Sequence, residues 1–462
     1  MRRMRACGWA VLAMVLPTVA AAQSLDESLA LAYWNNPTLK AERSALAALD
    51  HGVTEAVSAW RPTVTGTLGR QRSYLKAHDS EDTRVTGILP SSSASVTLSQ
   101  RLLDFGRTSG TVRAAEARVL AGRAGLANVE QTVLLEAAEA YLGVVWAERT
   151  RDLNRANVQV LDRQLEAAEA GFSRQMATLT DVAQARARHA NALAALRRAE
   201  ESLDTARGRY AAVTGEAPEN PAFPETPPAL PAARDEVLAQ AEAANPQVRA
   251  AAFAIEEARA VVDAAEAAIL PSVNFEASDS FQTNTARDVS DQRVQTLGVV
   301  VRVPLYQSGA EYARIQARKQ ELGQRRQQWE AARRAARQQA QEAWNALAAA
   351  QAQMRSFDAS VRANQTARDG VAAEHLRLGS RTLLDVLNAE QELFEARINL
   401  IGAQRDLLAA SYRGMAAMGR LTAESLNLAV VRYDPAAHYR DVRGSWLGWG
   451  DAESSAGEAA PR

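Results

Sequence analysis

The sequence predicts a mainly α-helical chain that carries a small β part and consists of two copies of one unit. Three observations predict this fold class. Landmark residues of the first half recur in the second half at a nearly constant spacing. Long proline-free stretches are rich in Ala, Glu, Gln, Arg and Leu, with 5% aromatic residues and a negative mean hydropathy, which favours long helices. Each copy also contains two short segments in which apolar residues alternate.

The internal repeat can be followed along most of the chain. At an offset of 209 residues, Asp26-Glu27, Asn36-Pro37 and Pro62 recur as Asp235-Glu236, Asn245-Pro246 and Pro271. At offsets of 203 and 204, Asp104-Phe-Gly106 matches Gln307-Ser-Gly309, and Thr178-Leu-Thr-Asp181-Val matches Thr382-Leu-Leu-Asp385-Val. The spacing predicts a first unit over 23–215 and a second unit over 232–421.

Residues 1–22 have the pattern of a secretory signal peptide. A basic start with three arginines precedes an apolar core, and Ala20-Ala21-Ala22 is a small-residue cleavage site. The only cysteine, Cys7, lies in this segment, so we expect no disulfide or thiol chemistry in the mature chain. Cleavage takes the formal net charge from −1 to −4 because it removes three arginines. This weak acidity argues against a nucleic-acid partner.

Each unit begins with a helix that carries Asn-Pro near its start and runs to Pro62 or Pro271. There the apolar period changes from that of a helix to that of a strand. We expect two pairs of strands, at about 62–72 and 94–103 in the first unit and at about 272–281 and 294–303 in the second. The polar segments between the strands of each pair, 73–93 and 282–293, are expected to be loops.

A long helix follows the strands in each unit, at about 108–172 and 312–378. At 1.5 Å per residue, each would be about 100 Å long. The chain then breaks, at about 173–181 and 377–385, and returns as a shorter helix. Large residues and alanines alternate in a seven-residue repeat along the returning helices, a pattern typical of closely packed, supercoiled helices. The breaks are therefore expected to be the tips of two long helical hairpins.

Two segments lie outside the repeated units. The proline-rich segment 216–231 is expected to be a linker between them. The C-terminal tail, 422–462, has no clear helical period, and after Trp449 its composition is that of a disordered segment.

No pattern indicates an enzyme, a metal site or a cofactor. The five histidines, His51, His78, His189, His375 and His438, are scattered and form no pair with metal-ligand spacing. No Gly-rich phosphate loop follows a strand, and no nucleophile motif occurs. We therefore expect neither catalysis nor a cofactor.

The predicted strands raise the question of what closes their sheet. No later apolar stretch of about 18 residues predicts a membrane helix. Strands can cross a membrane instead, but four strands cannot close a barrel, and unpaired backbone groups are not tolerated in lipid. If these are membrane strands, several copies of the chain must share one barrel.

Two tandem sets of these elements, together with Gly379-x-x-Thr-x-x-Asp385-Val386-Leu387 and Val303-Pro-Leu-Tyr-Gln-Ser-Gly309, resemble the TolC family of outer-membrane channel-tunnels. The resemblance covers about 25–421. It implies a homotrimer with a twelve-strand barrel in outer-membrane lipid and a helical tunnel across the periplasm. The implied partners are a periplasmic adaptor protein and an inner-membrane transporter of the ABC or RND type. The cargo would be proteins, by type I secretion, or small toxic molecules, by efflux.

The resemblance also implies a periplasmic gate at the tips. Asp385 falls on the first of two gate aspartates, and the second position is Asn388 here, which removes a charge from the constriction. Arg381 falls on an arginine that restrains the inner hairpin, and Asp181 on a carboxylate that such an arginine can contact. The first tip departs from the family because Gln175 stands where a glycine is usual.

The same residues have a plainer interpretation. Thr178-x-x-Asp181 and Thr382-x-x-Asp385 both fit a helix capping box, in which the threonine and the acid each bond a free backbone amide. Arg381 could equally be a solvated surface arginine.

A rival class for the whole protein is a periplasmic coiled-coil adaptor or structural protein without a membrane barrel. Such a protein would not need paired strand hairpins at matched places in two repeats. An ordinary porin, the other alternative, would need many more strands and few helices.

Overall fold

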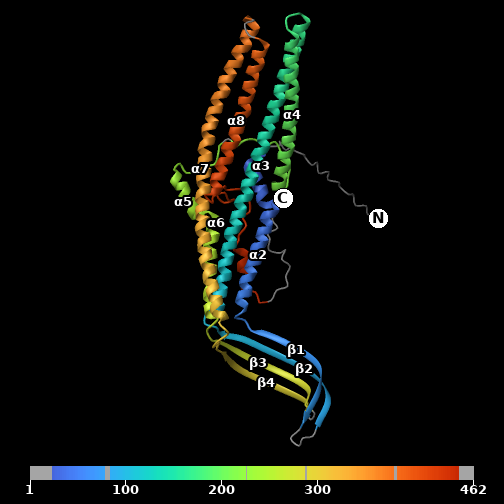
Figure 1. Ribbon diagram of the computed structural model, residues 1–462, viewed down its shortest axis with the longest axis vertical. Coiled ribbons are helices and arrows are strands. Elements are labelled where there is room, and N and C mark those ends of the chain that lie inside the picture. The colour runs from blue at the N-terminus through green and yellow to red at the C-terminus, as the bar shows by residue number, and fades with distance from the viewer. Residues whose placement is uncertain (1–22, 79–83, 225, 287–288, 379–381, 447–462) are drawn as a thin grey trace, which may run out of the picture.

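The computed structural model describes residues 23–446 except 79–83, 225, 287–288 and 379–381. The molecule is elongated: long helices extend from one end of a four-stranded sheet, and both helical tips lie far from that sheet (Figure 1). The predicted signal peptide and the end of the tail after Trp449 lie outside the described residues.

The two units contain the same elements in the same order, which confirms the predicted two-fold repeat. The first unit comprises α1 (Leu25–Asn35), α2 (Pro37–Ser58), β1 (Thr63–His78), β2 (Arg84–Leu103), α3 (Arg107–Ser173) and α4 (Leu179–Thr214). The second comprises α5 (Arg234–Ala244), α6 (Pro246–Ala267), β3 (Ser272–Ala286), β4 (Val289–Arg302), α7 (Ala310–Leu378) and α8 (Leu383–Ala417). The tail adds the short helix α9 (Ala437–Val442).

The expected helices that start at Asn-Pro are α2 and α6, but a separate short helix, α1 or α5, precedes each of them and was not predicted. The chain turns at Asn36, whose side-chain oxygen accepts a hydrogen bond of 2.9 Å from the Thr38 amide and thereby caps α2. Pro37 occupies the first turn, where its missing amide costs nothing. Asn245 and Pro246 repeat this arrangement at α6. An Asn-Pro pair inside a helical pattern is therefore a helix boundary here.

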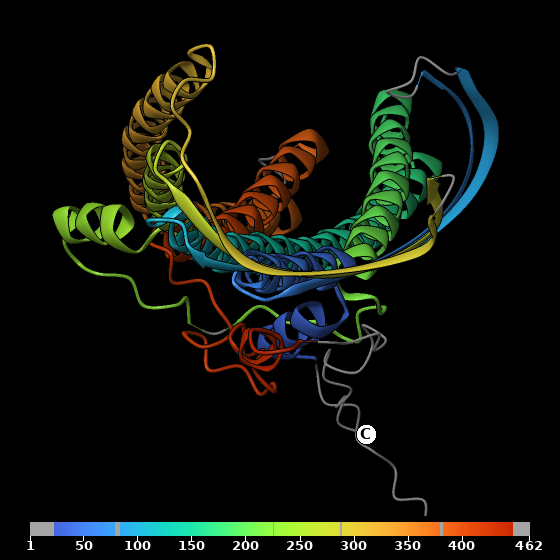
Figure 2. The ribbon, with the colours of Figure 1, turned by 90° about the horizontal axis from the view of Figure 1, so that it is seen from below.

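The four strands form one antiparallel sheet in the order β1-β2-β3-β4, and Figure 2 shows that it curves. The strands are longer than predicted, and much of each predicted loop is strand. In the first hairpin, Arg72 pairs with Pro90 and Tyr74 pairs with Ile88. The prediction failed because the ladder is held by backbone groups, which pair equally well beneath polar side chains.

The register gives the sheet two different faces. One face is apolar near the helices, where the row Val64, Leu98, Ala277, Leu297 crosses all four strands. The other face carries polar residues, such as the row Thr65, Thr97, Ser278, Thr296. Such alternation is typical of a sheet that separates an apolar environment from water.

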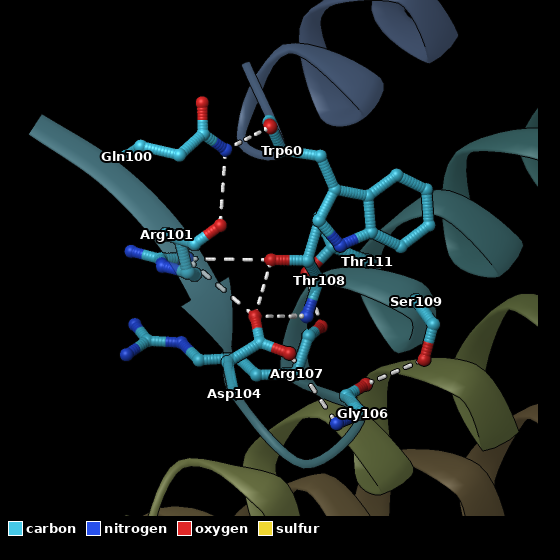
Figure 3. A network of polar contacts seen from close by, with 9 residues as sticks. All are labelled: Trp60, Gln100, Arg101, Asp104, Gly106, Arg107, Thr108, Ser109 and Thr111. Carbon is cyan, nitrogen blue, oxygen red and sulfur yellow. Dashed lines mark hydrogen bonds and ion pairs between the residues drawn. The ribbon is translucent and has the colours of Figure 1, made fainter. Parts of the chain in front are cut away.

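A buried carboxylate, Asp104, fixes the corner where β2 leads into α3 (Figure 3). It accepts hydrogen bonds from the amide and the hydroxyl of Thr108 and from the amide of Gly106, and the Arg101 guanidinium lies 3.6 Å away. Burial alone would raise the pKa of Asp104, but these bonds and the arginine outweigh it and lower that pKa. Phe105 and Gly106 both have positive φ, as do Ser308 and Gly309 at the matching corner.

The main core lies midway along the helices, where α1, α2, α3, α4 and α8 converge. Its largest fully buried side chains include Leu134, Tyr141 and Tyr210. The Tyr141 hydroxyl donates toward the Ala222 carbonyl at 2.8 Å, and the Tyr210 hydroxyl donates to Ser28 at 2.8 Å, so both buried hydroxyls have partners. Among the described residues, the helices lack any stretch that is both long and apolar enough to cross a membrane.

The tail folds back along α2 and α3. His438 lies 3.0 Å from the buried Asp50 carboxylate, and the Arg443 guanidinium lies 2.9 Å from Glu116. The guanidinium of Arg43 lies 4.7 Å from the centre of the Tyr33 ring and 5.1 Å from that of Tyr433 in the tail. The absence of a helical period therefore did not mean the absence of packing.

Candidate functional site at the helical tips

Both hairpins turn within a few residues at the end of the molecule remote from the sheet (Figure 1). The first turn joins α3 to α4 through Gln175, which has a left-handed backbone with φ of 59°. A left-handed residue is usually glycine or asparagine, so this glutamine stores a small strain in the tip. The second turn includes residues 379–381, so Arg381 lies outside the described residues.

Both capping boxes are formed. The Asp181 carboxylate accepts hydrogen bonds from the backbone amide of Thr178 at 2.8 Å and from its hydroxyl at 2.7 Å, while the Asp181 amide donates to that hydroxyl at 3.2 Å. These bonds lower the pKa of Asp181, so it is ionised at neutral pH. Asp385 accepts from the amide and hydroxyl of Thr382, both at 2.9 Å.

The structure places the residues predicted for the gate on two different hairpins, and Asp181 makes no hydrogen bond to the others in the described residues. Asp385 and Asn388 lie in the first turns of α8, and Asp181 lies in the first turn of α4. Within the described residues, the hydrogen bonds of the Asp181 carboxylate go to Thr178 alone. Asp181 and Asp385 are therefore separate caps, one for each returning helix.

An arginine that the sequence did not single out links the two hairpins. The Arg188 side chain, on α4, donates to the side-chain oxygen of Asn388 at 2.6 Å and to the Leu387 carbonyl at 3.5 Å. Asn388 is thus held at the position where the family resemblance implies a second aspartate. Residues 188 and 388 are 200 apart, so no local pattern could have predicted this contact.

Apolar side chains support the same contact between hairpins. Leu387 on α8 is almost fully buried and packs with Leu161 and Ala192 of the first hairpin. Leu383 packs partly against Ala168 and Val182. The start of α8 is therefore fastened to the first hairpin by two leucines and one hydrogen-bonded arginine.

The first tip also exposes apolar side chains. Met176 is 82% exposed and Leu179 is 69% exposed, and Phe172 beside them is 47% exposed. Exposed apolar groups that gather at one end of a molecule often mark a contact with another protein. The sequence signal was two large apolar residues in the predicted break and a third, Phe172, at the end of the helix before it.

The described part of the chain offers no place for a metal. No three of its His, Cys, Asp or Glu side chains are grouped as ligands. The tips present carboxylates, amides and guanidinium groups, which can restrain helices and select ions.

Comparison with known proteins finds one matching family model and several similar proteins. A family model described as "Outer membrane efflux protein" matches residues 28–216 and 237–420. The outer membrane efflux protein BepC of Brucella suis biovar 1 is 35% identical to this chain over 430 residues, covering 93% of this chain and 92% of BepC.

Two further likenesses bear on cargo and fold. The alkaline protease secretion protein AprF of Pseudomonas aeruginosa is 26% identical, covering 74% of this chain and 72% of AprF. The crystal structure of the outer membrane channel CmeC of Campylobacter jejuni superposes with a TM-score of 0.78 at 15% identity, covering 91% of this chain and 89% of CmeC. At that identity the likeness concerns the fold alone.

Proposed function

The chain belongs to the family of outer membrane efflux proteins, and from this membership we propose that it is the exit channel of a tripartite export system. It resides in the outer membrane and extends into the periplasm, as its relatives do. Its partners would be a periplasmic adaptor and an inner-membrane transporter, of the ABC or RND type. The relatives are channel proteins, and we propose no enzymatic activity for this one.

One observation carries the proposal: a sheet with an apolar face and two open edges continues into two helical hairpins, each about 100 Å long. In the part of the chain that the structure describes, strands β1 and β4 each pair with a single neighbour. Because lipid cannot satisfy their free backbone groups, another chain must. Three copies would contribute twelve strands to one closed barrel, and their helices would form the tunnel.

The tips would form the gate and the docking end of the tunnel. In a trimer, Asp385 of each copy would approach the axis, and Asn388 would add an amide instead of a second ring of charge. Arg188 would keep the constriction closed by holding Asn388, and Arg381 would restrain the same hairpin. The exposed side chains of Met176 and Leu179 would meet the adaptor or the transporter.

The experiment that tests this function is crosslinking of the native protein in membrane fractions, combined with heat-modifiability on gels. We expect a trimer in the outer membrane that resists detergent until heated, and reconstituted trimers should conduct ions. A soluble monomer or dimer in the periplasm would overturn the proposal and favour the coiled-coil adaptor.

Cargo class can be tested in the same strains. BepC is named for efflux and AprF for protease secretion, so relatives support both classes. In a deletion strain, loss of resistance to small toxic compounds would indicate efflux, whereas loss of a secreted protein from the medium would indicate type I secretion. Complementation with the intact gene is the control.

A further inference from the structure

We propose that the sheet binds a phosphate-bearing lipid of the outer leaflet, whose phosphate groups contact Arg70 and Arg72 on β1. The inference rests on the proposed function, because it requires the apolar face of the sheet to contact lipid. It concerns the border of that face farthest from the helices.

The border is visible in the register of the strands. On the apolar face, the first charged or amide side chains of β3 and β4 are Asp279 and Gln295, which pair with each other. On β1 and β2, beyond Gln100 at the helix end of β2, the face carries no polar side chain until the pair Arg70 and Ser92, two rows farther from the helices than Asp279. The apolar region therefore extends two rows farther from the helices on β1 and β2 than on β3 and β4, so that its border is inclined to the rows when averaged over the sheet.

The slant is what a level membrane boundary would produce. Two rows are four residues, about 13 Å along a strand, and β1 and β4 are about 14 Å apart. The averaged border is therefore inclined by about 40° to the direction perpendicular to the strands, which is close to the tilt of strands in barrels. In Figure 1, the sheet slopes downward from the ends of the helices, and β1 and β2 lie above β3 and β4. A horizontal line therefore meets β1 at a greater distance from the helices than it meets β4.

The charges along this boundary are not equivalent. Arg293, on β4, is paired with Asp279 by two hydrogen bonds of 3.0 and 2.5 Å, so its charge is compensated. Arg70 and Arg72 are exposed, and within the described residues neither guanidinium has an ion pair or a hydrogen bond. Two uncompensated guanidinium groups thus project from the apolar face at its distal edge.

A hollow of about 420 Å³ lies at the same place. Its walls include Leu68, Ala94 and Phe281 from three strands, and Arg70 and Ser92 stand at its polar side. Apolar walls suit an acyl chain, and a guanidinium binds phosphate oxygens in a fork of parallel donors. Together they fit an amphiphile with an anionic phosphate head, whereas a neutral lipid would leave both arginines uncompensated.

The test measures lipid retained by the purified trimer of the full mature chain, using native mass spectrometry after incubation with lipid A. Lipid A without its phosphate groups and free inorganic phosphate are parallel probes. We expect the Arg70→Gln, Arg72→Gln double variant to bind lipid A about 30-fold more weakly, on the order of fivefold per arginine. Ala94→Trp, which fills the hollow, should also weaken binding while the arginines remain.

The matched control is Arg302→Gln, which removes an exposed arginine of β4 on the opposite face, beside the helices. Equal retention by the double variant and the control would overturn the inference, as would equal binding of lipid A with and without phosphates. Retention of free phosphate but not of lipid A would overturn it too. If the double variant weakened the trimer instead, Arg70 and Arg72 would belong to a contact between copies. Failure of the unmodified chain to form an outer-membrane trimer would refute the proposed function itself.

Discussion

Single carboxylates fix the direction in which helices leave their neighbours. Asp104, just after β2, is the clearest case, because it accepts two hydrogen bonds from Thr108 in the first turn of α3 and one from the N-cap residue Gly106. The second unit has Gln307 at the matching position, where the side chain is exposed. The two units therefore turn the same corner with different chemistry.

We predict that Asp104→Asn lowers the free energy of unfolding by about 1–2 kcal/mol near neutral pH, because it weakens hydrogen bonds to a charged acceptor. The pKa of Asp104 is lowered in the folded protein. Its ionised form therefore adds stability above the pKa of the unfolded chain, and this contribution is lost as the pH falls through the folded pKa.

The measurement is denaturant unfolding of the purified protein over a series of pH values, with Gln307→Ala as the matched control. The difference between Asp104→Asn and wild type should shrink below a pH of about 3.9. A difference that stays constant into the acid range would show that the charge is not what stabilises this corner.

Contacts between helices decide how firmly the tips are held. Arg188 on α4 reaches Asn388 on α8, whereas Arg186, two residues earlier, pairs with Glu169 of its own hairpin at 2.8 Å. The two arginines are similar in sequence position, yet only Arg188 bridges the hairpins. Substitution of Arg186 is therefore a matched control for substitution of Arg188.

We predict that Arg188→Ala raises the open fraction of the channel about fivefold, since the lost hydrogen bond contributes about 1 kcal/mol to the closed tip. Single-channel recording of reconstituted trimers measures this directly. Asn388→Ala should have the same effect, and the double variant should add little. Arg186→Ala should leave the closed state unchanged, and equal opening by both arginine variants would argue against a bridge-based gate.

The shape of the whole molecule separates two tasks by a long distance. The sheet lies at one end, and the exposed apolar side chains of the first tip lie at the other, with the main core between them (Figure 1). Changes at the tip should therefore leave assembly of the sheet intact. This separation allows partner contact to be tested apart from trimer formation.

We predict that Met176→Asp abolishes export in cells while trimer yield and single-channel conductance stay at wild-type levels, because a charge at the tip is costly to bury against a partner. The control is Val431→Asp, at a side chain 59% exposed in the tail. Crosslinking to the adaptor should be lost only in the tip variant. Normal export by Met176→Asp would show that this tip is not part of the surface that contacts the partner.

Much of the fold follows from local sequence. The proline-free helices, the repeated corners and the capping boxes each depend on residues within a few positions of one another, so periodicity and turn chemistry suffice to predict them. Asn36 and Asn245 were visible too as the starts of helices, although the short helices that end just before them were missed. The strand ends were missed because polar side chains do not report backbone pairing.

The sequence by itself determined the two-fold repeat, the long helical hairpins, the apolar alternation of the strands and the family, because these properties are written in spacing and period. Only the tertiary structure decided that Arg188 binds Asn388, that Asp50 faces His438 in the tail, and that Arg70 lies uncompensated beside a hollow. Each of these depends on segments brought together from distant parts of the chain. A side chain's partner is set by where the backbone carries it, and that is a property of the packed molecule.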